Sequence, residues 1–167
     1  MTTAPEHLTG DEGTRKVARL IKDERIAMLT SVGADGTLLA RPMALQEVEF
    51  DGDLWFFAER GSRKVANVTA HPSVNVTVGS ATTWVSLSGT AVVVDDLDRK
   101  RELWNPFVEA WFPDGPEDPD VVLVKVTADG AEYWATPGRL ATLISFAKAK
   151  VTGQRYEGGD NARVDMA

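Results

Sequence analysis

Two neighbouring segments alternate between apolar and polar residues, and this alternation limits the folds open to the chain more than any other feature. In SVNVTVG (73–79) three valines alternate with asparagine and threonine, and in TWVSLSGTAVVV (83–94) Val85 and Leu87 alternate with serines. Successive side chains of a β-strand point to opposite faces, so a period of two indicates strands with one buried and one wetter face. The chain therefore contains a sheet with one packed side.

Two hairpins are expected ahead of these strands. IAMLTSV (26–32) and TLLARPMAL (37–45) flank a GADG turn, and QEVEF (46–50) and DLWFFAE (53–59) flank a DG turn. Glycine and aspartate at such positions are typical of hairpin turns. The chain is therefore expected to run through several antiparallel strands in succession.

Two further strands are expected near the end of the chain, at VVLVKVTA (121–128) and AEYWA (131–135). About six strands joined by short turns, with a few helices between them, predict an α+β fold built on an antiparallel six-stranded barrel with flanking helices. No G-x-G-x-x-G motif follows a strand, so a dinucleotide-binding fold of the doubly wound type is not supported.

The helical segments have recognisable ends. We expect helices at 11–24, 62–70, 95–103, from residue 106 onward and around 140–147. Thr9 and Glu12 have the spacing of a capping box for the first helix. The second helix should end before Pro72, because the residue preceding proline is driven out of the helical region. Asn105 is expected to cap a helix that has Pro106 at its first position.

The chain of 167 residues is long enough for one domain, which we expect at 11–150 between a flexible arm (1–10) and a flexible tail (151–167). It has no cysteine, which excludes disulfides, thiolate metal sites and a cysteine nucleophile. We find neither a signal peptide nor an apolar run of roughly 20 residues, the length that spans a bilayer. We therefore expect a cytoplasmic protein with no membrane partner. The net charge of -7 disfavours nucleic acid as a partner.

Small and basic residues gather where the second helix is expected to begin. In FFAERGSRKVANV (56–68), Ser62 is placed to cap the helix and Lys64 lies just inside it. The free N–H groups of a helix start, the positive end of its dipole and an ammonium group would together bind a phosphate. The alternative is that Ser62 is only a cap, and that Arg63 and Lys64 are solvated surface charges.

A second cation, Arg41, lies within the apolar strand LLARPMAL. A charge in such a strand needs a partner, and Pro42 directly after it cannot donate to a sheet. Arg41 and the Ser62/Lys64 helix start, separated by one hairpin, could converge on one phosphate. The alternative is that Arg41 pairs with a local carboxylate such as Glu47 or Glu59.

No set of catalytic side chains can be recognised. His7 lies in the expected arm and His71 precedes a proline at a helix end, while Ser86 and Ser88 have no histidine and aspartate at a suitable spacing. No cluster of metal-ligating residues appears either. We therefore leave the catalytic residues unassigned and expect no metal site.

The order of motifs resembles the flavin-binding split barrels. The motifs are Arg41-Pro42-Met43, LWFFAERGSRK, V-x-V-x-V, G-x-A-x-V-V-D-D (89–96), WNPFVEAWFPDGPEDPD (104–120) and AEYW (131–134). Among the split barrels, the chain is most similar to the pyridoxamine 5'-phosphate oxidase-like group known as general stress protein 26. The resemblance covers roughly residues 11–150, and its most specific part begins at Trp104.

The resemblance implies a homodimer that binds FMN in a cleft between its two subunits. The side chains of Arg41, Ser62 and Lys64 would hold the FMN phosphate, with Arg63 as a possible helper. Trp134 of AEYW matches a tryptophan that reaches the flavin from the neighbouring subunit, although plain core packing is the alternative for an aromatic residue at a strand end.

Backbone groups would line the rest of the cofactor. By the same resemblance, those around Pro42 and Met43, and those near Phe57 and Ala58, would lie along the ribityl chain and the isoalloxazine edge. Trp104 and Trp111 are assigned to packing or to the dimer interface rather than to the flavin.

The sequence also departs from the true pyridoxamine phosphate oxidases. They follow their E-F-W segment with R-L-H-D-R, whereas this chain keeps Arg139 but has Ala141 and Leu143 at the positions of the histidine and the second arginine. Gln46 stands where the oxidases have a lysine. We therefore expect that the chain does not oxidise pyridoxine or pyridoxamine phosphate.

The leading functional hypothesis is an FMN-dependent oxidoreductase of the general stress protein type, with NAD(P)H as a possible electron donor. A flavin-binding or flavin-buffering protein without turnover is the alternative from a different class. The same fold could also carry the deazaflavin F420, although its acidic tail would want a further basic groove, or haem, although neither histidine is well placed as an axial ligand.

Overall fold

The longest strand, β7 (Val121–Ala135), organises the sheet, and the computed structural model describes residues 6–136 and 160–166 around it. One edge of β7 pairs with β6, and its other edge is divided between β4 and β8. The remaining elements in chain order are β1 (Glu6–Thr9), α1 (Gly10–Ile21), β2 (Ile26–Val32), β3 (Leu38–Ala44), β4 (Asp53–Glu59), α2 (Arg63–Ala70), β5 (Ser73–Gly79), β6 (Thr83–Val94), α3 (Leu97–Leu103), α4 (Pro106–Trp111) and β8 (Asp160–Asp165).

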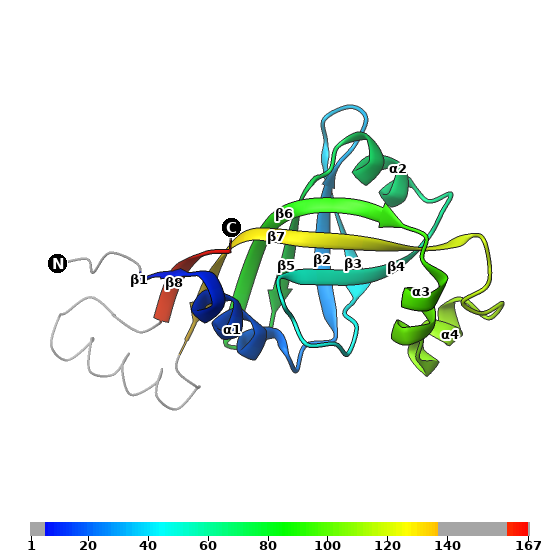
Figure 1. Cartoon of the computed structure of the whole chain (residues 1–167). Helices are drawn as coiled ribbons and strands as arrows, with labels where there is room; N and C mark the ends of the chain where they lie inside the picture. The colour runs from blue at the N-terminus through cyan, green and yellow to red at the C-terminus, as the bar shows by residue number, and fades with distance from the viewer. Residues whose placement is uncertain (1–5, 137–159, 167) are drawn as a thin grey trace, which may run out of the picture.

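Six of these strands, β2 to β7, wrap into a barrel that stays open along one line (Figure 1). The hydrogen-bonded order is β1-β8-β7-β6-β5-β2-β3, and β4 pairs only with β7. Within the described residues, no ladder joins β3 to β4, although the two strands approach each other. We call this gap the β3–β4 seam. It leaves one edge of each strand free of sheet partners.

The α+β class and the split-barrel architecture predicted from the sequence are confirmed, with eight strands in the described part rather than six. The predicted strand at 46–50 is wrong. Because β4 pairs with β7, these residues have no partner strand and run as a loop beside Arg25, which forms an ion pair with Glu47. The two strands expected at 121–128 and 131–135 are one continuous strand, β7.

Part of the expected flexible arm (1–10) and part of the expected flexible tail (151–167) belong to the sheet. Residues 6–9 form β1, which pairs in parallel with β8, and β8 pairs with the far half of β7. Ala162 and Val164 of β8 are buried, and α1 packs on them closely: a Cβ on Gly13 would lie 2.3 Å from Val164 Cγ1. Backbone pairing therefore holds residues 6–9 and 160–165 in the sheet, and apolar burial adds to it at β8. The helix expected around 140–147 lies outside the described residues.

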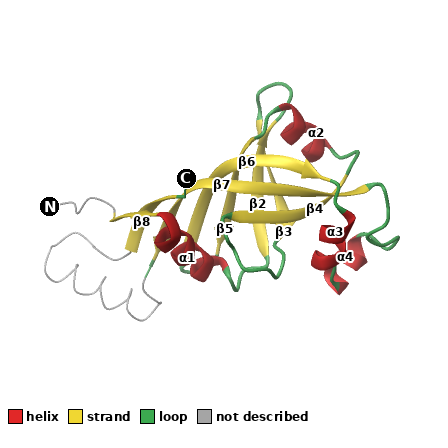
Figure 2. Cartoon of the chain, viewed as in Figure 1, coloured by secondary structure: helices red, strands yellow, loops and turns green. Residues whose placement is uncertain are grey.

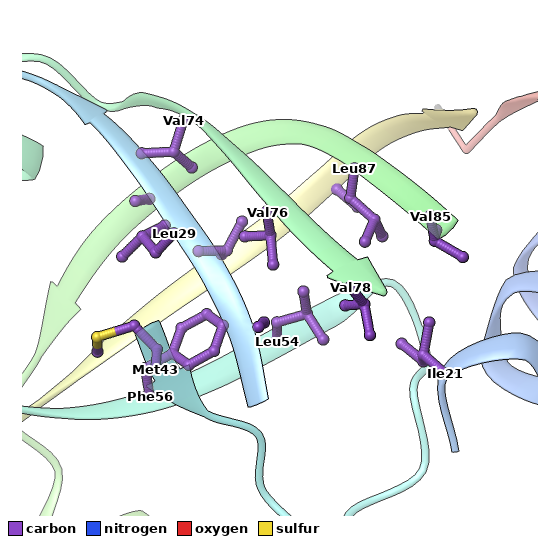
Figure 3. Packing of buried hydrophobic residues seen from close by; sticks show 14 of the residues in the cluster. Ile21, Leu29, Met43, Leu54, Phe56, Val74, Val76, Val78, Val85 and Leu87 are labelled. Carbon is purple, nitrogen blue, oxygen red and sulfur yellow. The ribbon is translucent and has the colours of Figure 1, made fainter. Parts of the chain in front are cut away.

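The alternating segments supply the barrel interior, as predicted. Val74, Val76 and Val78 of β5, with Val85 and Leu87 of β6, are all buried. Figure 3 shows these side chains converging with those of other strands, and Met43 of β3 lies beside Phe56 of β4. Burying each such side chain stabilises the fold by about 1.5–3 kcal/mol. Arg41 and Met43 belong to the same face of β3.

The helices lie at the ends of the barrel rather than over one face (Figure 2). α2 lies near one end, and α3 and α4 lie beyond the start of β7, where a second apolar cluster forms. Asn105 Oδ1 accepts hydrogen bonds from the N–H groups of Phe107 and Val108, so the predicted cap with Pro106 at the first position is confirmed. None of the described helices is long and apolar enough to cross a membrane.

Candidate functional site

A cavity of about 320 Å³ opens at the β3–β4 seam, between β3, β4, the start of α2 and the helix α4. Its lining residues are Ile26, Pro42, Met43, Ala44, Gln46, Phe57, Glu59, Lys64, Phe107, Val108, Trp111 and Phe112. Four residues expected at the cofactor, from three different elements, thus line one cavity. We call it the seam cavity.

A larger cavity lies elsewhere in the described part of the chain. It measures about 610 Å³ and lies between α1, the 45–50 loop and the start of β4. Its charges are mixed, with cations such as Arg19 facing carboxylates such as Glu49. It contains none of the residues expected at the cofactor. The seam cavity is therefore the candidate site.

Arg41 reaches from β3 toward α2. Its guanidinium Nη1 donates to Ser31 Oγ at 3.4 Å, and the same oxygen accepts from Asn67 Nδ2 of α2 at 3.3 Å. Glu47, one suggested partner of Arg41, pairs instead with Arg25. No carboxylate within the described residues forms an ion pair with Arg41, so a half-buried cation faces only a neutral hydroxyl.

Ser62 stands at the N-cap position of α2 but does not cap the helix. Its backbone is extended, as a cap requires, yet its side chain makes no hydrogen bond to the first turn. Its Oγ is buried and has no hydrogen-bond partner among the described residues. The predicted side-chain cap is therefore wrong. Leaving a buried polar atom unpaired costs about 1–3 kcal/mol, so such an atom in a folded protein needs an explanation.

The two cations after Ser62 differ in position. Lys64 is half-buried and lines the seam cavity, whereas Arg63 is exposed and does not line it. Lys64 and Asn67 are three residues apart and share one face of α2. Because Asn67 contacts the hydroxyl that Arg41 also contacts, Arg41 and Lys64 approach the same side of this helix. Arg41 and Lys64 therefore lie on one side of α2, although only Lys64 lines the seam cavity; their convergence on one phosphate stays a prediction.

The turn that leads into α2 is fixed by Arg60. Its N–H donates to Asp120 O at 2.7 Å, its Nε to Pro119 O at 2.8 Å, and its Nη2 to Asp95 at 2.5 Å. The hydrogen bond from Arg60, followed by the one from Lys100, holds the pKa of Asp95 below its usual value. The helix start that carries Ser62 is therefore held on a rigid support.

The remaining expected residues on β4 and β7 fall into two groups. Phe57 is buried under the cavity, with its ring 5.4 Å from that of Trp104 in an edge-to-face contact. The side chain of Ala58 lies in the barrel interior, so only its backbone could face a ligand. Trp134 lies at the far end of β7, half-exposed and paired with Trp84. The structure does not bring Trp134 to the seam cavity of its own chain.

The neutral residues in and around the site were not predicted from the sequence. Ser31 occupies a core-facing position of β2 after Ala27 and Leu29. A small polar residue at such a position indicates a buried hydrogen bond, so Ser31 could have been singled out from the sequence. Asn67 and the pair Phe107/Trp111 gave no comparable signal, because polar and aromatic residues on short helices are common. Trp104 packs as predicted, whereas Trp111 is 70% exposed.

The chemistry of the site suits a phosphate-sized anion. The orphaned Ser62 hydroxyl can donate to such a group, the first N–H groups of α2 lack partners within the helix, and Arg41 and Lys64 supply positive charge. The free edges of β3 and β4 add backbone donors and acceptors along the seam. No group of three or more metal-ligating side chains is assembled in the described ranges.

Comparisons with known proteins identify the family of the chain. The family model for pyridoxamine 5'-phosphate oxidase like proteins matches residues 12–157. Protein bli-3 of Neurospora crassa is 31% identical over 157 residues, covering 86% of this chain and 75% of that protein.

Two solved structures are similar over most of their length. One, from Jannaschia sp. CCS1 and assigned to general stress protein 26, has a TM-score of 0.75 and 29% identity, covering 93% of this chain and 99% of that one. The other, the general stress FMN/FAD binding protein of Xanthomonas citri, has a TM-score of 0.64 and 31% identity, covering 74% and 89%. The chain belongs to the pyridoxamine 5'-phosphate oxidase-like family, in the group of general stress protein 26.

Proposed function

We propose that the chain binds FMN in the seam cavity and acts as an FMN-dependent oxidoreductase of the general stress type. The observation that carries the proposal is the buried Ser62 hydroxyl, which has no partner in the described part of the chain and lies beside the start of α2. The similar protein from Xanthomonas citri is named for FMN/FAD binding, which supports the same assignment.

Different residues would contact different parts of FMN. Ser62 and the N–H groups of α2 would donate to the phosphate, and Lys64 and Arg41 would neutralise its charge. Pro42 and Met43 would lie along the ring system, while Phe57 supports it from below. When bound, FMN supplies the redox chemistry, and the chain supplies orientation and exclusion of water.

We further propose that two copies of the chain pair across the outer face of the sheet. This face carries exposed apolar side chains: Ile26, Met28, Leu38, Trp84 and Trp134. Met28 lies next to Pro42 in the ladder, and Ile26 lines the seam cavity, so the apolar face continues to the cavity rim. Such a pairing would bury the Trp84/Trp134 pair and bring Trp134 of one copy toward the cavity of the other.

The first experiment is an absorption spectrum of the purified chain after addition of FMN and removal of the excess. A bound flavin spectrum is expected, and none at stoichiometric FMN would contradict the proposal. Lys64→Ala and Arg41→Ala should each weaken FMN binding roughly 10- to 100-fold, because each removes a charge-assisted hydrogen bond worth about 1.5–3 kcal/mol. Arg63→Ala, next to Lys64 but outside the cavity, is the matched control and should change affinity less than threefold.

Turnover separates the oxidoreductase from a protein that only stores flavin. Bleaching of bound FMN by NADH or NADPH under anaerobic conditions supports an enzyme with that donor. Ala141 and Leu143, which replace the substrate-gripping residues of the true oxidases, lie outside the described residues; by their sequence we propose that no pyridoxal phosphate is formed.

A further inference from the structure

Two aromatic side chains of α4 stand exposed at the mouth of the seam cavity. Phe107 is 54% exposed and Trp111 is 70% exposed, and both line the cavity. They are four residues apart, so they share one face of the helix. Neither packs into the apolar cluster beneath α4, which takes Val108 instead. Large aromatic side chains left exposed beside a cavity mark a binding surface more often than a packing defect.

The helix that carries them is held in place without any ligand. Asn105 caps α4 and donates through Nδ2 to Gln46 Oε1 at 3.1 Å, which ties the helix to the end of β3. Val108 is buried against the cluster that contains Phe57 and Leu123. The aromatic pair is therefore a pre-formed wall, and little conformational freedom would be lost when a ligand stacks on it.

The charges around this wall are acidic. Glu109 follows Phe107 on the exposed side of α4, and Asp114 and Glu59 lie nearby in the chain and in the cavity lining. The cations of α3 are already paired: Arg99 with Glu102, Lys100 with Asp95, and Arg101 with Glu117. Among the described residues lining the cavity, Lys64 of α2 is the one cation and Glu59 is the one carboxylate. Because α4 carries the carboxylate of Glu109 and no cation, an anionic substrate would find no charge partner on this helix.

We infer that Phe107 and Trp111 bind the second substrate of the enzyme, and that this substrate is a small, planar, uncharged aromatic compound of the quinone class. The inference rests on the proposed FMN site, because the ligand would lie between the aromatic wall and the flavin ring. A quinone bound there would take up two electrons and two protons from the reduced flavin, leave as the hydroquinone and restore the oxidised flavin.

The test uses the FMN-loaded protein and two probes that differ in charge. Binding of 1,4-naphthoquinone and of its 2-sulfonate is measured by calorimetry with oxidised flavin. We expect the uncharged quinone to bind at least about tenfold more tightly than the sulfonate. Trp111→Ala should weaken quinone binding about tenfold, since it removes an aromatic stacking partner. Trp111→Phe should retain most of the affinity.

Controls separate this inference from the proposed function. Val92→Ala changes an exposed apolar residue that does not line the cavity and should leave quinone binding unchanged. The thermal midpoint of Trp111→Ala should match that of the unmodified protein, because the Trp111 side chain is 70% exposed. In reoxidation of the reduced flavin, Trp111→Ala should raise KM for the quinone more than it lowers kcat.

Three results would overturn the inference while leaving FMN binding intact: equal affinity for the two probes, unchanged quinone binding in Trp111→Ala, or protection of Trp111 from acrylamide quenching because a second copy covers it. The acrylamide quenching of Trp111 is obtained as the difference in quenched tryptophan fluorescence between the unmodified protein and Trp111→Phe. If FMN itself does not bind, the proposed function and this inference both fail.

Discussion

Two buried or half-buried serines near α2 have opposite hydrogen-bonding situations. Ser31 Oγ accepts from both Arg41 and Asn67, whereas Ser62 Oγ has no partner within the described ranges. Removing an acceptor that two donors share leaves those donors unpaired, and removing an unpaired hydroxyl relieves a cost. Identical substitutions at the two positions should therefore have opposite effects on the free protein.

Ser62→Ala should raise the unfolding free energy of the FMN-free protein by about 1 kcal/mol or leave it unchanged. The same change should weaken FMN binding roughly tenfold, because the phosphate loses one hydrogen bond. Urea unfolding of the free protein and fluorescence titration with FMN measure the two quantities. Ser31→Ala is the matched control and should lower the unfolding free energy. A loss of stability in Ser62→Ala without a loss of FMN affinity would show that the hydroxyl has a structural partner.

Only some residues of the candidate site could be proposed from the sequence. Arg41 and Lys64 were found because cations within an apolar strand or at a helix start need a partner. Ser62 was singled out as a helix cap, but its hydroxyl does not cap the helix. The exposure of Phe107 and Trp111 could not be predicted, because aromatic residues four positions apart occur both on packed and on exposed helix faces. Only the packing of α4 decides which face is exposed.

Among the elements, the end of β4 and the start of α3 are joined by a charged latch. Asp95 bridges Arg60 and Lys100, and Lys100 is buried and also donates to Val121 O at 3.0 Å. The latch fixes the turn before α2 against the start of β7. Its contribution depends on the ionised form of Asp95, because the hydrogen bonds from Arg60 and Lys100 lower the pKa of this carboxyl in the folded state.

A depressed folded-state pKa stabilises the protein above the unfolded pKa, which is roughly 3.9 for aspartate, and this stabilisation is lost as the pH falls through the folded value. Asp95→Asn should therefore lower the unfolding free energy at neutral pH, and the difference from the unmodified protein should shrink below about pH 4. Urea unfolding across this range measures it. Asp98→Asn, a change at a 97% exposed side chain in the first turn of α3, should have little effect at any pH. A difference for Asp95→Asn that stays constant down to low pH would contradict the latch.

Strands and helices that bury one face could largely be predicted from the sequence. The strands β5 and β6 follow from their alternation, and α4 follows from Asn105 and Pro106. Residues 46–50 misled the prediction because a DG turn suggests a local hairpin, whereas β4 pairs with β7 from about 70 residues further along the chain. Local turn chemistry does not report on a partner that is distant in sequence.

At the scale of the whole molecule, the outer sheet face is the surface that a second copy would cover. Met28 lies in its middle, opposite Pro42 on one side and Thr77 on the other. Placing a charge there would force it into the interface without a partner, which costs several kcal/mol. The seam cavity would then lose any contribution from the other copy.

Met28→Glu should therefore convert the protein from a dimer to a monomer and weaken FMN binding at least about tenfold. Light scattering coupled to gel filtration gives the oligomeric state, and FMN titration gives the affinity. Val48→Glu is the control: Val48 has the same 39% exposure as Met28 but lies in the 45–50 loop, away from the outer sheet face. A monomeric unmodified protein with full FMN affinity would rule out the shared site.

The divided edge of β7 has a consequence for how the chain is assembled during synthesis. Residues 121–127 of β7 pair with β4, whereas residues 130–135 pair with β8, whose residues lie further along the chain. All six barrel strands and the walls of the seam cavity are therefore present once residue 135 has left the ribosome. The far half of β7 keeps an unpaired edge until residues 160–165 have been synthesised and pair with it. The nascent chain therefore carries an aggregation-prone strand edge at one end, while the seam cavity at the other end can already form.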